Sequence, residues 1–208
     1  MPTGPGSWRR ETPVDAAPKP SRRRPDDRRA EIIQAARGVF LAGGYDGAAL
    51  AEVAAAGDVS RGSIYRYFPS GRNDLFAAVV DQLVTELQER LRYAASVPFS
   101  AATRMEHLVG ALFAFFQEEP DAYRFLFREV WAAGEPSIEA AGLAARAMLT
   151  AEIAGVIADT DSSVEELSAA SAGILGFALA NVELALGGEV DAETAWRVTC
   201  SYATSQLA

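Results

Sequence analysis

Apolar residues recur at helical spacing from about residue 26 onward. The first stripe begins near Asp26 or Asp27, keeps the i, i+4, i+7, i+8 spacing of one helix face, and ends at Gly43-Gly44. Two short stripes follow, with Ser60 placed to cap the second of them, and then one long stripe over about 20 residues. The apolar positions of these four predicted helices are Ile32, Ala36, Val39 and Phe40; Leu50, Val53 and Ala54; Val59, Ile64 and Phe68; and Phe76, Val79, Val80, Leu83, Leu87 and Leu91.

Five further helices are predicted in the rest of the chain, each from a start signal. Proline suits the first helical turn, Ser and Asp are good N-caps, and Ser163-x-x-Glu166 has the spacing of a capping box. No alternation of polar and apolar residues convincingly predicts a strand. The five helices are expected at 100–117, 120–133, 136–159, 163–187 and 191–206, starting at Ser100, Pro120, Pro136, Ser163 and Asp191.

The pattern therefore predicts an all-α protein of about nine helices. Pro69-Ser70-Gly71 is a sharp break, which suggests a three-helix unit at residues 26–75 fused to a larger helical domain at residues 76–208. We expect residues 1–25 to be a disordered basic tail, because Pro and Gly are dense there and apolar residues are sparse. Its run Arg22-Arg23-Arg24 is either a solvated tail or an arm that contacts phosphates or a minor groove.

The third predicted helix carries the most informative side chains. Residues 50–68 have the pattern of two short helices joined by a tight turn, in which Asp58 tolerates a left-handed backbone. Around the core-facing Ile64, the third helix has hydroxyl, aromatic and basic groups that suit phosphate oxygens and base edges, while Gly62 permits close approach to the groove floor. The residues predicted to contact DNA are Ser60, Arg61, Gly62, Ser63, Tyr65, Arg66 and Tyr67, with Arg72 at the start of the fourth helix.

The spacing alone also fits a generic helical hairpin with an exposed polar face. Residues 28–76, however, resemble the N-terminal domain of TetR-family transcriptional repressors, in which a helix ending F…GY precedes an Ile/Val-Ala helix and then S-x-G-T/S-L/I-Y-x-Y-F. The matching residues here are Phe40, Gly44-Tyr45, Val53-Ala54, Val59-Ser60 and Arg61-Gly62-Ser63-Ile64-Tyr65-Arg66-Tyr67-Phe68. The resemblance implies a helix-turn-helix domain whose recognition face is formed by Ser60, Arg61, Gly62, Ser63, Tyr65 and Arg66.

Three departures from the family pattern bear on DNA contacts. Ala48 and Ala49 replace the usual hydroxyl residue at the start of the second helix, which removes an N-cap unless Asp46 substitutes for it. Asp58 stands in the turn, where a carboxylate is close to phosphate. One residue is inserted after the aromatic pair, so that Arg72 becomes the cation at the start of the fourth helix.

Residues 105–131 are rich in aromatic side chains, which form either ordinary core or part of an apolar ligand cavity. The family resemblance implies that a small-molecule effector binds somewhere in this larger domain. The residues predicted to line its pocket are Met105, Phe113, Phe116, Phe127, Trp131, Met148 and Phe177.

Residues 163–187 are apolar on nearly every face, so this helix must be covered on every face. One large domain could cover it alone, but we favour a two-fold homodimer in which it packs, together with residues 191–206, against its copy. The residues predicted for the interface are Ala172, Leu175, Gly176, Leu179, Ala180, Val182, Leu186, Trp196 and Tyr202.

The net charge of −9 argues against nucleic acid only superficially. Residues 1–75 hold 12 Lys/Arg and 9 Asp/Glu, whereas residues 76–208 hold 7 and 19. Most of the positive excess lies in the tail, and residues 26–75 alone come to −1. The DNA prediction therefore depends on where individual charges lie.

Other functional classes have little support. His107 and Cys200 are single, so they cannot assemble a zinc cluster, and no phosphate-binding glycine loop or Ser/His/Asp set stands out. Glu118, Glu119 and Asp121 suit the start of a helix better than acid–base catalysis. We expect no metal, no cofactor and no enzymatic activity.

The expected location is the cytoplasm. A single cysteine forms no internal disulfide, and no secretory signal is visible. The longest uncharged run, Leu167 to Val182, has 16 residues, fewer than the ~20 that a membrane span needs.

The sequence thus predicts a homodimeric, ligand-responsive repressor. Residues 60–67 of each subunit enter the major groove of a palindromic double-stranded DNA operator. A small apolar effector in the C-terminal domain shifts the population to a conformer with wrongly spaced recognition helices, through rotation of the fourth helix. The alternatives are a helical small-molecule carrier with lost DNA binding and, less well supported, an all-helical enzyme.

Overall fold

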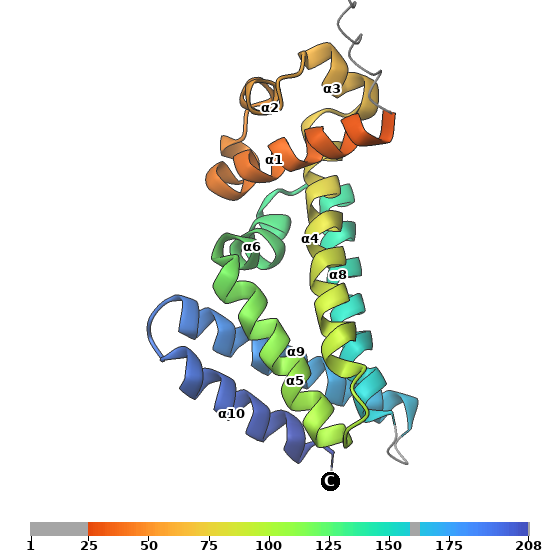
Figure 1. Cartoon of the computed structure of the whole chain (residues 1–208), viewed down its shortest axis with the longest axis vertical. Helices are drawn as coiled ribbons and strands as arrows, with labels where there is room; N and C mark the ends of the chain where they lie inside the picture. The colour runs from red at the N-terminus through yellow and green to blue at the C-terminus, as the bar shows by residue number, and fades with distance from the viewer. Residues whose placement is uncertain (1–24, 159–162, 208) are drawn as a thin grey trace, which may run out of the picture.

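The computed structural model describes residues 25–158 and 163–207 of the 208-residue chain, and within these ranges every regular element is helical. Three helices, α1 (Pro25–Gly47), α2 (Leu50–Ala56) and α3 (Arg61–Tyr67), sit at one end of the long helix α4 (Arg72–Ala95) (Figure 1). The remaining elements are α5 (Ala101–Glu118), α6 (Pro120–Arg124), the π-helical turn η1 (Phe125–Glu129), α7 (Val130–Ala132), α8 (Pro136–Ile157), α9 (Val164–Leu186) and α10 (Ala192–Ser205). The predicted all-α fold, with a small unit joined to a larger one, is confirmed.

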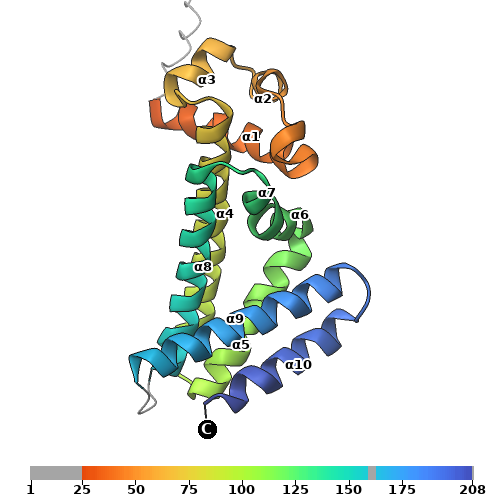
Figure 2. The ribbon, with the colours of Figure 1, turned by 180° about the vertical axis from the view of Figure 1, so that it is seen from behind.

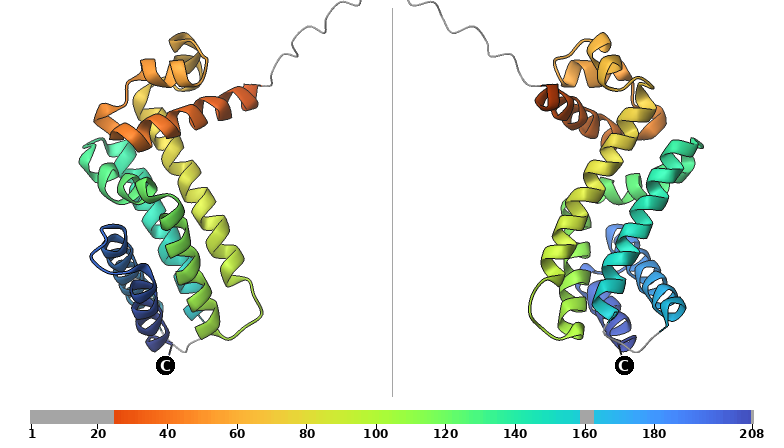
Figure 3. Two further views of the ribbon diagram at one scale, coloured as in Figure 1. Left: turned by 60° about the vertical axis from the view of Figure 1, so that its left-hand side comes forward. Right: turned by 90° about the vertical axis from the view of Figure 1, so that its right-hand side faces the viewer.

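Helix α4 is the axis of the molecule. Every apolar position of its predicted stripe is buried, because helices cover it along its whole length. Helix α5 returns antiparallel to α4, whereas α8 runs beside α4 in the same direction (Figures 1 and 2). At the far end, α9 and α10 form an antiparallel pair that packs on α5 and α8 (Figure 3).

The predicted helix starts are confirmed where their signals are local. Ser60, Ser100 and Asp191 each accept a hydrogen bond from the backbone N–H three residues later, as N-caps do. Ser163 and Glu166 form the reciprocal capping box. The predicted tail, in contrast, lies outside the described residues except for Pro25.

The predicted helix at 120–133 is divided into α6, η1 and α7. The π turn widens the helix over Phe125–Glu129, so residues after it are rotated relative to a regular α-helix. Phe125, the first residue of this turn, has its ring centroid 4.2 Å from that of Phe76. Phe76 in turn meets Phe40 edge-on at 5.2 Å. The apolar core therefore continues from the three-helix unit into the larger domain.

Helix α1 has a kink at Gly44, where the sequence predicts its end. The backbone of Gly44 has φ 68 and ψ −174, a conformation accessible to glycine, and helical structure resumes briefly to Gly47. A Cβ atom at this position would collide with the carboxylate of Glu129 from η1. Gly44 therefore permits a close approach between α1 and the larger domain.

Candidate DNA-binding interface

The turn between α2 and α3 is built from local signals. Val53 anchors α2 in the core, and Val59 N–H donates to the Ala54 carbonyl at 2.9 Å. Asp58 takes the predicted left-handed conformation with φ 47. Its carbonyl accepts a hydrogen bond of 3.3 Å from Arg28 on α1, which ties the turn to the first helix.

Helix α3 is fixed by its cap and by two apolar residues. Ser60 Oγ accepts from Ser63 N–H at 3.1 Å and lies 3.0 Å from Ser63 Oγ. Ile64 and Phe68 are buried in the core, and Arg29 of α1 stacks over the Phe68 ring at 5.2 Å. The opposite face of α3 is therefore directed away from the core.

The outward face contains most of the residues predicted to contact DNA. Tyr65 is 51% exposed, and neither it nor Arg66 is enclosed in the interior. Ser63 is half-buried, and the ring of Tyr67 packs partly against the core. The exposed members of the predicted set are Ser60, Arg61, Gly62, Tyr65 and Arg66.

The arginines of the three-helix unit differ in what they contact. Arg28 pairs with Glu31 at 2.8 Å, and Arg37 is buried in ion pairs with the larger domain. Arg61 and Arg66, in contrast, make no ion pair with any residue in the described ranges. Their guanidinium groups are consequently available to phosphate oxygens or guanine edges.

Arg72 lies apart from the α3 residues, at the start of α4. Its Nη1 donates to the carbonyls of Tyr45 and Asp46 at 3.1 and 3.4 Å, and its guanidinium stacks 4.9 Å over the Tyr45 ring. It borders a recess that Tyr65 also lines, between α3 and the start of α2. Arg72 thus holds the end of α1 against α4, which the sequence did not indicate.

The start of α2 is uncapped, as the two alanines suggest. Ala49 has the extended backbone of an N-cap but supplies no side-chain acceptor, and Asp46 does not replace it. A hydroxyl that the family pattern usually provides is therefore missing from this edge of the surface. Within the described ranges, no cluster of three or more His, Cys, Asp or Glu side chains could hold a metal ion.

The residues predicted to line a ligand pocket lie in several different environments. Phe116 and Phe127 lie in an aromatic cluster with Tyr123, at centroid distances of 5.4–5.8 Å. Burial raises the pKa of Tyr123, whose hydroxyl donates to the Leu179 carbonyl at 3.1 Å. Of the other predicted residues, Met105 is fully buried, Met148 is half-buried, Trp131 is 43% exposed, and Phe177 stacks on Tyr202 at 4.4 Å.

Phe113 lines a surface cleft between α5 and α10 together with Trp196. None of the other residues predicted for the pocket lines this cleft. A second, more apolar groove of about 530 Å³ runs between α8 and α9, past Leu143, Arg146 and Leu167. Neither opening was indicated by the sequence, because each depends on how distant helices cross.

The residues predicted for a dimer interface fall on two faces of the α9–α10 pair. Leu175, Leu179 and Val182 pack inside their own subunit. The exposed members, Ala172, Ala180 and Trp196, lie on the outside, and Gly176, Leu186 and Tyr202 are half-buried. Small side chains on the outer face of α9 leave its backbone open to close approach by another helix.

Helices α8 and α9 are long and apolar enough to cross a membrane, by length and composition only. Both instead lie in the bundle, with α8 along α4 and α9 along α10. Within the subunit, 33% of each apolar stretch is buried.

Taken together, the two-helix motif, the outward polar face of α3 and its unpaired arginines define a helix-turn-helix DNA-binding protein. The family described as bacterial regulatory proteins, tetR family, matches residues 32–79, which span α1 to α4. Over these residues the chain is similar to the DNA-binding domain that this family model describes.

Curated relatives agree with this assignment. The chain is 30% identical over 115 residues to the HTH-type transcriptional activator FasR of Mycolicibacterium smegmatis, covering 55% of this chain and 52% of that protein. It is also 30% identical over 116 residues to the HTH-type transcriptional repressor KstR of the same organism, covering 52% and 55%. The chain thus spans about half the length of the curated relatives it matches.

Solved structures extend the similarity of fold to most of the chain. A transcriptional regulator from Pseudomonas aeruginosa PAO1 matches with a TM-score of 0.74 at 18% identity, over 88% of this chain and 91% of that chain. FadR from Bacillus subtilis, solved in complex with stearoyl-CoA, matches with a TM-score of 0.72 at 14% identity, over 86% and 99%.

Proposed function

We propose that this protein is a homodimeric transcriptional repressor that binds a palindromic DNA operator through α3. A small apolar molecule bound in the C-terminal domain releases it from that operator. The observation that carries this proposal is the outward face of α3, where Arg61, Tyr65 and Arg66 are exposed and the two arginines have no ion pair with any described residue. Guanidinium and hydroxyl groups on one exposed helix face suit phosphate oxygens and base edges.

Dimerisation is supported by the outer surface of the larger domain. The apolar stretches of α8 and α9 are only partly buried, and α9 presents small residues there. A two-fold pair of subunits would cover this surface and present two copies of α3 to successive major grooves, ~34–36 Å apart.

An effector site is supported by the openings in the larger domain. The cleft beside Phe113 and Trp196 and the groove beside Leu143 have volumes of about 450 and 530 Å³, within the usual range of small-molecule pockets. The aromatic cluster of Phe116, Tyr123 and Phe127 includes one residue of η1, and η1 contacts the DNA-binding unit through Phe125. Binding near this cluster would favour one orientation of that unit over another.

The compartment follows from the function. A regulator that binds the operators of a bacterial chromosome works in the cytoplasm, and we propose this location with no membrane partner, no cofactor and no catalytic role.

The second candidate is a helical small-molecule binder with weak or lost DNA binding. The uncapped α2 and the carboxylate of Asp58 in the turn favour this alternative.

Selection of bound sequences from a random DNA pool tests the proposal and separates it from the alternative. We expect a palindromic consensus to emerge, and mobility shifts to show that Arg66→Ala and Tyr65→Phe bind it more weakly. If Arg66 contacts phosphate, Arg66→Ala reduces the slope of log K against log salt by about 1. Arg90→Ala, on the exposed part of α4, is the matched control and keeps wild-type affinity.

The repressor assignment is tested separately with a reporter gene placed behind the selected sequence. Expression should fall when the protein is present and recover in Arg66→Ala. A wild-type protein with no preference for any sequence over random DNA at moderate salt would instead support the helical binder.

A further inference from the structure

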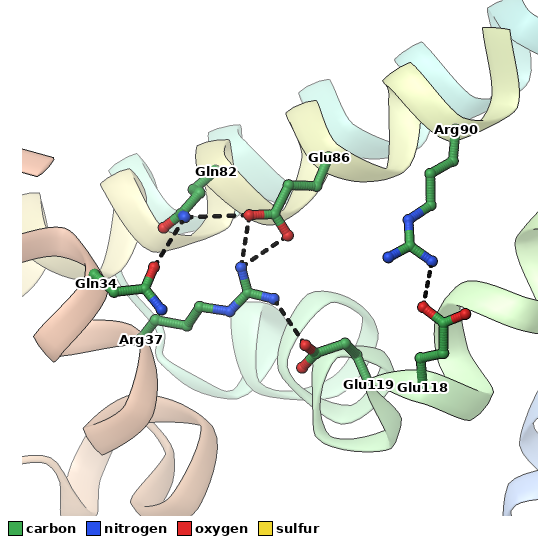
Figure 4. Close-up of polar contacts among 7 residues, drawn as sticks. All are labelled: Gln34, Arg37, Gln82, Glu86, Arg90, Glu118 and Glu119. Carbon is green, nitrogen blue, oxygen red and sulfur yellow. Dashed lines mark hydrogen bonds and ion pairs between the residues drawn. The ribbon is translucent and has the colours of Figure 1, made fainter. Parts of the chain in front are cut away.

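Arg37 occupies a position on α1 that would ordinarily hold an apolar residue. It lies four residues after Ile33 and three before Phe40, both of which are buried, and it is itself only 8% exposed. Its guanidinium therefore sits at the junction of the DNA-binding unit and the larger domain, largely removed from solvent (Figure 4). A charge in this position needs partners, because desolvating an unpaired guanidinium is strongly unfavourable.

Two carboxylates from different elements supply those partners. Arg37 Nη1 lies 2.7 Å from both carboxylate oxygens of Glu86 on α4. Its Nη2 lies 3.2 Å from Glu119 Oε1, at the joint between α5 and α6. One side chain of α1 thus binds both α4 and the α5–α6 joint (Figure 4).

A pair of glutamines extends the network. Gln82 Nε2 donates to Glu86 Oε1 at 3.1 Å and to Gln34 Oε1 on α1 at 3.3 Å. Gln82 Oε1 is buried and has no hydrogen-bond partner among the residues that the structure describes. This unsatisfied acceptor indicates that Gln82 is oriented by its two donor contacts, which add a second link between α1 and α4.

A separate contact fixes the other end of α1. Tyr45 N–H donates to Glu129 Oε2 of η1 at 2.9 Å, across the kink at Gly44. Arg124 donates to the Leu41 carbonyl at 2.6 Å and pairs with Glu129 Oε1 at 3.1 Å. The larger domain therefore holds α1 at its middle and at its end.

These attachments restrict a motion that the covalent chain leaves open. The backbone joins the two units only through α4, and a single rod allows the DNA-binding unit to rotate about its axis and to bend. The Glu129 contact alone would still permit pivoting about the end of α1. The Arg37 contact lies away from that pivot, so both together fix the orientation of α3 relative to the larger domain.

We propose that Arg37 is a positioning residue that sets the orientation of α3 and thereby the half-site spacing that the homodimer accepts. The inference rests on the proposed function, in which two copies of α3 read one palindrome. A change of one base pair in spacing moves a half-site by ~3.4 Å and rotates it by ~35° about the DNA axis. When the orientation of α3 is fixed, the homodimer binds such a displaced half-site weakly. When α3 is loosely held, it can reorient and bind the displaced half-site.

Two adjacent glutamates provide a matched pair of variants. Glu119 pairs with Arg37 of the DNA-binding unit, whereas Glu118 pairs with Arg90 of α4 at 2.5 Å, inside the larger domain (Figure 4). The sequence suggested only that both acidic residues precede a helix; the structure places them in ion pairs. Glu119→Gln removes one partner of Arg37, and Glu118→Gln removes a similar charge without affecting that link.

The experiment compares full-length wild type, Glu119→Gln and Glu118→Gln on the palindrome selected by the wild type. Binding is measured on the selected spacing, on spacers one base pair shorter or longer, and on a single half-site. We expect wild type and Glu118→Gln to prefer one spacing equally. In Glu119→Gln that preference falls by about fivefold or more, the lower end of ordinary coupling between sites, while half-site affinity stays at the wild-type level.

The possible failures are distinguishable. A wild type that selects no palindrome overturns the proposed function and the inference with it. A wild type with a fixed spacing preference that Glu119→Gln retains overturns the inference alone. A Glu119→Gln protein that loses half-site affinity in parallel also overturns it, because Arg37 would then support the fold of the reading unit. Glu86→Gln, which removes the other partner of Arg37, provides a second variant with the same three readouts.

Discussion

At the scale of single residues, arginine side chains have different roles according to where the fold places each of them. Arg37 is buried between two carboxylates, Arg72 is stacked on Tyr45, and Arg66 is exposed and pairs with no acidic residue in the described part of the chain. A count of positive charges in residues 26–75 therefore overstates what is available to DNA. Affinity depends on the few arginines that have no internal partner.

The two serine N-caps provide a residue-scale prediction. Ser60→Ala removes the cap of α3 and Ser100→Ala removes the equivalent cap of α5, so each is expected to lower the free energy of unfolding by about 0.5–2 kcal/mol in urea titrations. Only Ser60→Ala should also weaken operator binding, because α5 lies in the larger domain. Equal DNA affinities of the two variants would contradict a reading role for α3.

At the scale of elements, the sequence predicts what is decided locally. The cap at Ser60, the left-handed Asp58 and the box at Ser163 were predicted because each depends on residues within one turn of helix. The contact between Glu129 of the π turn and Tyr45 was not predicted, because these two residues are 84 positions apart in the sequence. The burial of Arg37 was missed for the same reason.

The kink in α1 gives an element-scale prediction. Gly44→Ala places a Cβ atom against Glu129 and requires a left-handed backbone, so it should destabilise the protein by roughly 1–3 kcal/mol. Gly38→Ala, on the exposed side of α1 with open space around it, should instead stabilise by ~0.5–1 kcal/mol. Chemical denaturation of both variants measures the difference. A Gly44→Ala protein as stable as Gly38→Ala would show that α1 and η1 are not tightly held together.

At the scale of the whole molecule, the arrangement of helices decides which residues share a surface. Four residues of α9 were predicted to lie in one dimer interface. Leu175 and Val182 are instead buried within the subunit, whereas Ala172 and Ala180 are exposed on its surface. Phe113 and Trp196 line the same cleft only because α10 folds back on α5. Periodicity identifies the apolar side of a helix, but helix packing determines which neighbour covers it.

Gly176 on α9 allows the proposed dimer to be tested without disturbing the subunit. A Cβ atom there meets nothing within 4 Å, so Gly176→Arg should fold normally. We expect the added charge to weaken the dimer by about tenfold or more, or ~1.4 kcal/mol, in sedimentation equilibrium. Ala30→Arg, on the exposed surface of α1, is the control and should leave the dimer intact. An unchanged dimer in Gly176→Arg would place the interface elsewhere.

The shared aromatic contact of Phe40, Phe76 and Phe125 bears on the design of hybrid regulators. Such hybrids join the DNA-binding domain of one regulator to the ligand-binding domain of another. A graft that ends at residue 75 would leave Phe40 facing a foreign surface, since Phe76 and Phe125 both come from beyond that point. Functional hybrids of this protein should therefore carry over the start of α4 and match the aromatic residue supplied by η1.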